Sequence, residues 1–510
     1  MGQKVNSSKS FLTLRKYLED LPLFLVILPL FLFIHIEQEH RHLITYRFVY
    51  REIIELSVVP FLFWGIGYLF MRHVRKSALL ALLCSIVFYF FCDLKDWLHE
   101  TAPGYFFERY MFLLPAIVIL LGYAFIQLRR SVSTFKRTFL FANTLFVIFV
   151  LVDCLRILTD PSLTKMDLGD QKKTISSDYS ACGDCLKPDI YYIVFDAYAS
   201  SKILETEFKY NNHELDSFLD KNGFFTVHNS KSNYNLTPFS IACSFNLNYL
   251  RNVNFEKKIS FKEYLPGLNA VYLSELTRIL KKEGYEIINN SVFDIKNYPT
   301  INPPSNLWSI DLIYKRHNIF RKIDSDIGWL IRGYLNIKTI QQTNADYIKR
   351  KDQHFLNTFD SLLKTSEISS GKQRFVYGHL VLPHLPSAFD SVGNRVQLPV
   401  KVPSEEENRK RYLQLVSFSG KAIITIVQSI LSNVNRPTVI IIQADHGYLF
   451  PDTSKKDLEF ANLNAMYFYN QDYRMLYDSI SNVNTFRVIF NTFFKKHYPL
   501  LKDTSYFIHK

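Results

Sequence analysis

The 510-residue sequence has few glycines and cysteines, 17 and six respectively, and contains no internal repeat. Its average composition, 48% apolar and 21% charged, excludes a disordered chain or a low-complexity filament. What the sequence has in abundance is aromatic surface, with 44 phenylalanines and 31 tyrosines. So much apolar surface indicates a buried area larger than one globular core requires.

The apolar residues are concentrated near the amino terminus, in five successive stretches that carry no formal charge. A membrane helix needs roughly 20 predominantly apolar residues, and about 17 at the low end. Five such stretches separated by short polar loops favour membrane helices over the buried helices of a soluble bundle. We therefore predict a transmembrane domain over residues 1–156, a five-helix bundle with spans at about 21–36, 54–71, 77–92, 110–128 and 138–154.

Basic residues predict the orientation, because short loops rich in Lys and Arg stay in the cytoplasm. They gather in the leader and in the loops after the second and fourth spans: Lys4, Lys9, Arg15, Lys16, Arg72, Arg75, Lys76, Arg129, Arg130, Lys136 and Arg137. In the other loops acids offset the bases. The amino terminus is thus expected in the cytoplasm, with everything after Val152 outside, in the periplasm or its equivalent. The first span lacks a small-residue cleavage site, so we expect an uncleaved anchor in the inner membrane.

The net charge of +13 divides between the two halves of the chain. Residues 1–160 hold 17 basic and 12 acidic residues, a balance of +5, which leaves +8 for the remainder. The predicted topology and the lack of a basic–aromatic repeat argue against a nucleic-acid partner. An anionic membrane surface or a phosphorylated substrate is the expected partner of the basic outer part.

The cysteines divide by position. Cys84, Cys92 and Cys154 lie in or beside the predicted spans and are expected to pack as apolar side chains. Cys182 and Cys185 form a C-x-x-C pair outside the membrane, where a local disulfide is favoured over a two-thiol metal site, and Cys243 would remain unpaired.

The chain changes character after the membrane region. Residues 157–187 are polar and aperiodic, as is typical of a stem. Residues 188–510 alternate short apolar runs with helical patterns, which predicts one large α/β domain with a mostly parallel sheet covered by helices.

Polar residues follow three of the predicted strands, and the carboxyl ends of such strands gather functional groups. Asp196 follows the run 190–195, Asp445 and His446 follow the run 438–442, and His384 follows the run 375–382. Two carboxylates and a histidine at one edge would suit zinc or manganese. Taken alone, Asp196 is more simply interpreted as a helix N-cap. Asp445 is harder to interpret as a cap, because a cap requires neither the imidazole of His446 nor the glycine that follows it.

The segment 232–244 predicts a helix start, with Thr237 at the N-cap and Pro238 at the first helical position. A hydroxyl at a helix amino terminus lies where backbone N–H groups attract an anion. Beside a metal it could ionise and attack phosphorus or sulfur. From this segment alone, a simple cap is the favoured interpretation of Thr237.

Together these motifs resemble the membrane-anchored branch of the sulfatase and alkaline phosphatase superfamily, which includes lipoteichoic acid synthases and lipid A phosphoethanolamine transferases. The matching segments are K-P-D-I-Y-Y-I-V-F-D-A-Y from Lys187, S-N-Y-N-L-T-P-F-S-I-A from Ser232, G-H-L-V-L-P-H-L-P from Gly378 and I-I-Q-A-D-H-G from Ile441. The resemblance covers most of residues 187–510 and implies a catalytic domain of alkaline-phosphatase-like (sulfatase) fold.

The resemblance also implies roles for particular residues. Asp196, Asp445, His446 and Thr237 would hold one divalent metal ion, zinc or manganese, with Thr237 also the nucleophile. His384 and His379 would bind substrate or assist the leaving group, and Asn233 is a further substrate-binding candidate.

The expected activity is transfer of a phosphoethanolamine or phosphoglycerol headgroup from a membrane phospholipid to an envelope glycan or lipid, through a phospho-threonine intermediate. Ala197 after Asp196, and a Thr-Pro-Phe-Ser-Ile segment without arginine, depart from the soluble sulfatases and argue against their formylglycine chemistry. A phosphoester or sulfuric-ester hydrolase of the same superfamily, and a non-catalytic envelope protein, are the alternatives.

Overall fold

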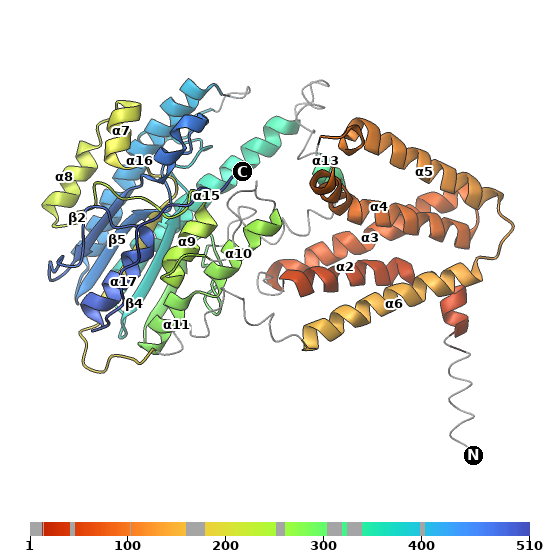
Figure 1. Ribbon diagram of the computed structural model, residues 1–510, viewed down its shortest axis with the longest axis horizontal. Helices are drawn as coiled ribbons and strands as arrows, with labels where there is room; N and C mark the ends of the chain where they lie inside the picture. Colours follow the sequence, from red (N-terminus) through yellow and green to blue (C-terminus); the bar gives the residue numbers. More distant parts are fainter. Residues whose placement is uncertain are drawn as a thin grey trace, which may run out of the picture. The chain divides into compact units, whose positions relative to one another are not determined.

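The computed structural model describes Thr13 and residues 15–40, 46–102, 104–159, 179–250, 261–302, 319–323, 339–397 and 403–509. The chain divides into two compact units (Figure 1). One comprises Met1–Lys165 and Ser309–Lys338, and the other comprises Met166–Trp308 and Thr339–Lys510. Most of the predicted stem, 157–187, lies outside the described residues.

The first unit is helical. Its helices are α2 (Phe24–His40), α3 (Tyr46–Met71), α4 (Val74–Thr101), α5 (Tyr110–Arg130), α6 (Lys136–Thr159) and the short α13 (Ile319–Ile323), with the 3₁₀ turn η1 (Phe106–Glu108) before α5. Within this unit α3 packs along α4, and α2 along α6. Each of the five predicted spans coincides with one of the helices α2 to α6.

Four helices in the described part of the chain are long and apolar enough to cross a membrane. Three of them are α4, α5 and α6, whereas the apolar parts of α2 and α3, Phe24–Ile36 and Leu56–Met71, are shorter. α5 has no buried residue, and Val118, Ile119 and Leu120 are each about two-thirds exposed. A helix that is apolar all round needs an apolar surrounding, which a bilayer supplies.

The fourth of these helices, α16 (Glu405–Ser432), belongs to the second unit. Ser404 and Glu407 form a capping box at its start, and its first turn carries three glutamates. It packs against α15 (Thr339–Glu367) and α8 (His213–Lys221). Its apolar stripe therefore has protein partners.

The second unit is built on a six-stranded mixed sheet of order β2-β6-β5-β1-β4-β3. The strands are β1 (Asp189–Phe195), β2 (Phe225–Thr226), β3 (Glu286–Asn290), β4 (Arg374–Leu380), β5 (Thr438–Ala444) and β6 (Asn464–Phe468). β5, β1, β4 and β3 are parallel, while β6 pairs antiparallel with both β5 and β2. The predicted parallel arrangement therefore holds at the centre of the sheet and ends at β6.

Helices cover both faces of the sheet (Figure 1). The remaining ones are α7 (Ser201–Phe208), α9 (Thr237–Asn246), α10 (Phe261–Tyr272), α11 (Glu275–Lys282), α17 (Asn482–Phe493) and the 3₁₀ helix η4 (Thr453–Phe460). On one face Tyr192 of β1 stacks on Tyr377 of β4, and both contact Phe245 of α9. On the other face Leu362 of α15 lies against Gly378. A β-carbon added at Gly378 would lie only 2.8 Å from the Leu362 side chain. The central strands β1, β4 and β5 are buried along their whole length, as expected for a sheet covered on both sides.

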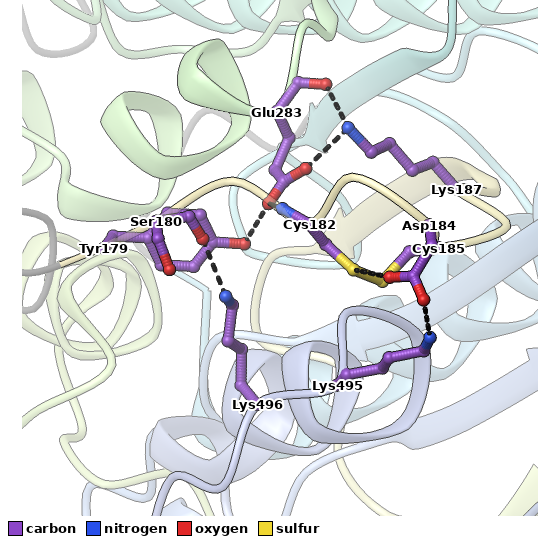
Figure 2. The surroundings of a disulfide bond; sticks show 9 residues. All are labelled: Tyr179, Ser180, Cys182, Asp184, Cys185, Lys187, Glu283, Lys495 and Lys496. Carbon is purple, nitrogen blue, oxygen red and sulfur yellow. Dashed lines mark hydrogen bonds and ion pairs between the residues drawn. A yellow bond between two sulfur atoms is a disulfide. The ribbon is translucent and has the colours of Figure 1, made fainter.

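Cys182 and Cys185 form a disulfide, which confirms the predicted pairing (Figure 2). Asp184, between them, accepts a hydrogen bond from Lys495 at 2.5 Å. The other four cysteines, Cys84, Cys92, Cys154 and Cys243, are free thiols, so Cys243 is unpaired as predicted.

A buried glutamate fastens the segment that contains this disulfide (Figure 2). Oε1 of Glu283 accepts hydrogen bonds from the hydroxyl of Tyr179 and the amide of Cys182, and Oε2 lies 2.7 Å from the ammonium of Lys187. Glu283 is 4% exposed, so its charge depends on these partners. The segment that leads into β1 is thereby tied to the end of α11.

Candidate metal and nucleophile site

Two carboxylates meet where parallel strands β1 and β5 end. Phe195, the last residue of β1, lies opposite Ala444, the last residue of β5, so Asp196 and Asp445 leave the sheet side by side. His446 follows Asp445, and its Nε2 lies 3.7 Å from Oδ1 of Asp196 and 3.6 Å from Oδ2 of Asp445. All three side chains are buried, and one potential ligand atom from each lies within 4.8 Å of the others.

The hydrogen bond of His446 decides which of its nitrogens faces the carboxylates. Nδ1 donates to the carbonyl of Gly447 at 2.7 Å, so Nε2 presents a lone pair to the two acids. Oδ2 of Asp445 is buried and has no hydrogen-bond partner. Such a group is costly to bury unless a cation balances it. An imidazole nitrogen and two carboxylate oxygens fit a borderline divalent ion such as Zn²⁺ or Mn²⁺.

Gly447 is required by the close approach of a neighbouring strand segment. A β-carbon there would lie 2.4 Å from the carbonyl oxygen of Ala461 and 3.0 Å from that of Glu459. The amide of Gly447 donates to this same Glu459 carbonyl at 2.7 Å. The glycine in the Asp-His-Gly sequence therefore lets the chain turn closely enough to place His446 at the acids.

The backbone orients Asp445. Its Oδ1 accepts hydrogen bonds from the amides of Ala197 and His446 at 3.0 and 2.9 Å, and the Ser240 hydroxyl donates to its carbonyl at 2.5 Å. Ala197 has φ of 64°, a left-handed conformation that an alanine adopts only under constraint. Burial raises the pKa of Asp445, but His446, His379, the Thr237 hydroxyl and the Ala197 amide outweigh it, and the pKa lies below its ordinary value.

Thr237 is brought to this cluster by α9. It is the first residue of the helix, and its hydroxyl lies close enough to Asp445 to help lower the pKa of that carboxylate. The prediction that Thr237 serves as the N-cap is wrong: the N-cap is Leu236, which makes no side-chain capping bond, and Pro238 occupies the first turn. The hydroxyl is therefore directed to the acid cluster at a helix amino terminus, where backbone N–H groups favour anions.

The simpler interpretation of Asp196 as a helix cap is also wrong. The next helix, α7, begins at Ser201, and its cap is Ser200, whose hydroxyl accepts from the amide of Ile203. Asp196 lies four residues earlier, and its carboxylate lies at His446.

His384 stands in the loop after β4. Its ring centroid lies 6.3 Å from that of His446, and its ring is half-buried. Nδ1 donates to the carbonyl of Leu385 at 2.5 Å, which assigns the acceptor lone pair to Nε2. The structure therefore brings His384 beside the cluster as a group that can exchange a proton at its outer side.

His379 lies within β4 and is fully buried, so it is enclosed behind the cluster. Nδ1 lies 2.9 Å from the hydroxyl of Tyr377, and Nε2 has no hydrogen-bond partner. Burial, opposed by Asp445 and aided by His446, lowers the pKa of His379 to about 4. His379 is therefore neutral at physiological pH.

Asn233 does not join the site. Its Nδ2 donates to the hydroxyls of Tyr249 and Ser481 and to the carbonyl of Thr504, and its Oδ1 accepts from the amide of Val483. These contacts engage both the nitrogen and the oxygen of the Asn233 amide within the protein, and its predicted role in binding substrate stays a prediction. It joins the segment before α9 to the start of α17 and the carboxyl-terminal segment.

Two further residues near the cluster, Tyr264 and Lys351, were not predicted from the sequence. Burial and then the charges of Asp196 and Asp445 raise the pKa of Tyr264, whose ring packs edge-on against Phe239 of α9. Lys351 of α15 is 3% exposed and lies near enough to Asp196 for their charges to interact. Neither stands in a motif, and Lys351 is one of several basic residues in a long helical pattern, so no local signal marks them.

No family model matches the chain, and no curated protein matches it. Several solved structures do, at low identity. The carboxyl-terminal periplasmic domain of EptC from Escherichia coli is 12% identical, with 66% of this chain and 92% of that chain covered and a TM-score of 0.38.

The integral membrane lipooligosaccharide phosphoethanolamine transferase A (EptA) from Neisseria meningitidis is 13% identical, with 94% of this chain and 95% of that chain covered and a TM-score of 0.36. The periplasmic domain of phosphoethanolamine transferase EptC from Campylobacter jejuni is 12% identical, with 61% and 91% covered and a TM-score of 0.36.

Proposed function

We propose that this protein is a metal-dependent, membrane-bound transferase that moves a phospho-headgroup from a phospholipid to an envelope glycan or lipid. The observation that carries the proposal is the buried grouping of Asp196, Asp445 and His446, with the Thr237 hydroxyl near Asp445 at the amino terminus of a helix. A hydroxyl so placed is a nucleophile next to a site for an anion.

Asp196, Asp445, His446 and Thr237 would hold one divalent ion, Zn²⁺ or Mn²⁺. When bound, that ion would lower the pKa of the Thr237 hydroxyl and offset charge on the phosphoryl oxygens. The protein's own residues supply the positioning: the amides of Ala197 and His446 fix Asp445, and helix α9 places the Thr237 hydroxyl near it.

In the first step Oγ of Thr237 forms a bond to the donor phosphorus, and the bond from phosphorus to the glycerol oxygen breaks. Nε2 of His384 takes the hydroxyl proton of Thr237 and passes it to the departing glycerol oxygen, so that diacylglycerol leaves as the neutral alcohol. In the second step an acceptor hydroxyl attacks the phospho-threonine and gives its proton to His384, which returns a proton to the departing oxygen of Thr237 and so restores the free threonine. The enclosed position of His379 favours His384 for both transfers.

Two features support a lipid donor outside the cytoplasm. The apolar helices α4, α5 and α6 would keep the chain in the bilayer that contains the donor. The disulfide of Cys182 and Cys185 is typical of an oxidising compartment. We therefore place the α/β unit on the periplasmic side of the inner membrane, with the amino terminus in the cytoplasm.

The test uses the purified full chain in detergent micelles with fluorescent phosphatidylethanolamine or phosphatidylglycerol. We expect release of fluorescent diacylglycerol from one of them, and mass spectrometry should find an adduct on Thr237 whose added mass identifies the headgroup. An acceptor glycolipid then distinguishes the reactions. Free headgroup as the sole product would make the protein a hydrolase, and no turnover of either lipid would contradict the proposal.

A further inference from the structure

The loop that carries His384 is held from two sides. On one side the amide of His384 donates to the backbone carbonyl of Asp196 at 3.0 Å. On the other side the ammonium of Lys351 donates to the carbonyls of His384 and Pro386, at 2.5 and 3.2 Å. The loop is thus fixed between a candidate metal ligand and a buried cation.

The next residue of α15 extends this attachment. Oδ1 of Asp352 accepts from the Ser387 hydroxyl at 2.7 Å, and Oδ2 accepts from the amide of Ala388 at 3.0 Å. Asp352 is fully buried, like Lys351. Two consecutive residues of one helix therefore bind four of the five loop residues 384–388, all except Leu385.

We propose that Lys351 is a positioning residue that sets the place of the His384 imidazole by binding the carbonyls on either side of Leu385. This role rests on the proposed function, in which His384 relays a proton. Leu385 also accepts the hydrogen bond from Nδ1 of His384, so the segment that Lys351 holds is the one that orients the ring.

Burying the charged ammonium group of Lys351 costs folding free energy unless its hydrogen bonds compensate. Burial lowers the pKa of Lys351 to about 8, while Asp196 and Asp352 oppose the shift. Among the described residues no carboxylate forms an ion pair with it, so its hydrogen bonds to the two loop carbonyls are its close polar contacts. A helix that only needed packing there would be served by an apolar side chain.

The first experiment is independent of activity. Hydrogen exchange is measured by mass spectrometry on the full chain in micelles, comparing wild type with Lys351→Met and with Lys349→Met, an exposed neighbour on the same helix. We expect Lys351→Met to speed exchange in the peptide 381–390 at least fivefold and to leave β1 and β5 unchanged, with no effect of Lys349→Met. Unchanged exchange in that peptide, or equal acceleration throughout the α/β unit, would overturn the proposal.

The second experiment measures release of fluorescent diacylglycerol in a double-mutant cycle. Lys351→Met alone is expected to lower kcat 10- to 100-fold with little change in KM, whereas in the His384→Ala background it should cost less than twofold. Equal losses in both backgrounds would mean that Lys351 does not act through His384. If wild type turned over no lipid, the proposed function would fail, while the exchange result would still decide whether Lys351 holds the loop.

Discussion

The Nε2 atom of His446 lies 3.6 Å from Oδ2 of Asp445, and the hydrogen bond from Nδ1 to Gly447 makes Nε2 an acceptor. Asp445 has a pKa below its ordinary value and is ionised at neutral pH. A buried carboxylate oxygen without a hydrogen-bond partner, such as Oδ2 of Asp445, is costly unless a cation lies at it. This relationship makes metal affinity the most direct property to measure.

Replacing Asp445 by asparagine should lower the affinity for Zn²⁺ by more than about a hundredfold, because even outer-shell changes cost about 10- to 100-fold. The number of zinc ions bound per chain is measured by elemental mass spectrometry after equilibration in buffers of defined free zinc concentration. Asp457→Asn, at an exposed position, is the control and should bind as wild type does. Equal affinity of the two variants would remove Asp445 from the site.

Thr237→Ala should lower kcat for lipid turnover by about a thousandfold or more, because it removes the proposed nucleophile. Thr237→Ser keeps a hydroxyl and should retain measurable activity and the mass adduct. Thr425→Ala is the control, since that hydroxyl only donates to its own helix at Lys421. A Thr237→Ala enzyme that worked at the wild-type rate would show that the transferred group never resides on this residue.

The sequence predicted the centre of the sheet and the grouping of Asp196, Asp445 and His446 at its edge, because both depend on local signals. The runs before Asp196 and Asp445 are continuous and apolar, and parallel strands necessarily place their carboxyl ends together. Thr237 was found as a helix start, although its place in that helix was off by one position, since capping and first-turn positions share residue preferences.

The missed features depend on contacts between distant segments. Asn233 has no partner that the sequence could predict, because three of its four hydrogen-bond partners lie about 250 to 270 residues further along the chain. Lys351 reaches a loop 33 residues away, and nothing in the periodicity of α15 marks it. The antiparallel strand β6 follows a long irregular segment whose direction the local pattern does not determine.

Gly447→Ala should reduce zinc affinity although it removes no ligand. The added methyl group would lie 2.4 Å from the carbonyl of Ala461, so the turn must shift and carry His446 away from the acids. Gly371→Ala is the matched control, because open space surrounds a β-carbon there. Zinc titration of both variants checks this, and wild-type affinity in Gly447→Ala would mean that the turn adjusts without moving His446.

Acid should destabilise the α/β unit through its buried histidines. Burial, and to a smaller extent His379, lower the pKa of His354 on α15 to about 4, whereas an unfolded histidine titrates near its ordinary 6.5. Between these two pKa values, His354 binds a proton in the unfolded chain but not in the folded chain. Stability is therefore full above about pH 6.5 and falls as the pH approaches 4, by on the order of 3 kcal/mol for this group.

The measurement is the urea midpoint of the α/β unit by pulse proteolysis, on the full chain in micelles with a chelator present, at pH 7.5, 6 and 5. We expect the midpoint to fall with pH in wild type and less steeply in His354→Gln. His213→Gln, at an exposed position, should keep the wild-type slope. Because His379 carries a depressed pKa as well, His354→Gln should retain part of the pH dependence, and a slope unchanged from wild type would show that His354 is protonated equally in both states.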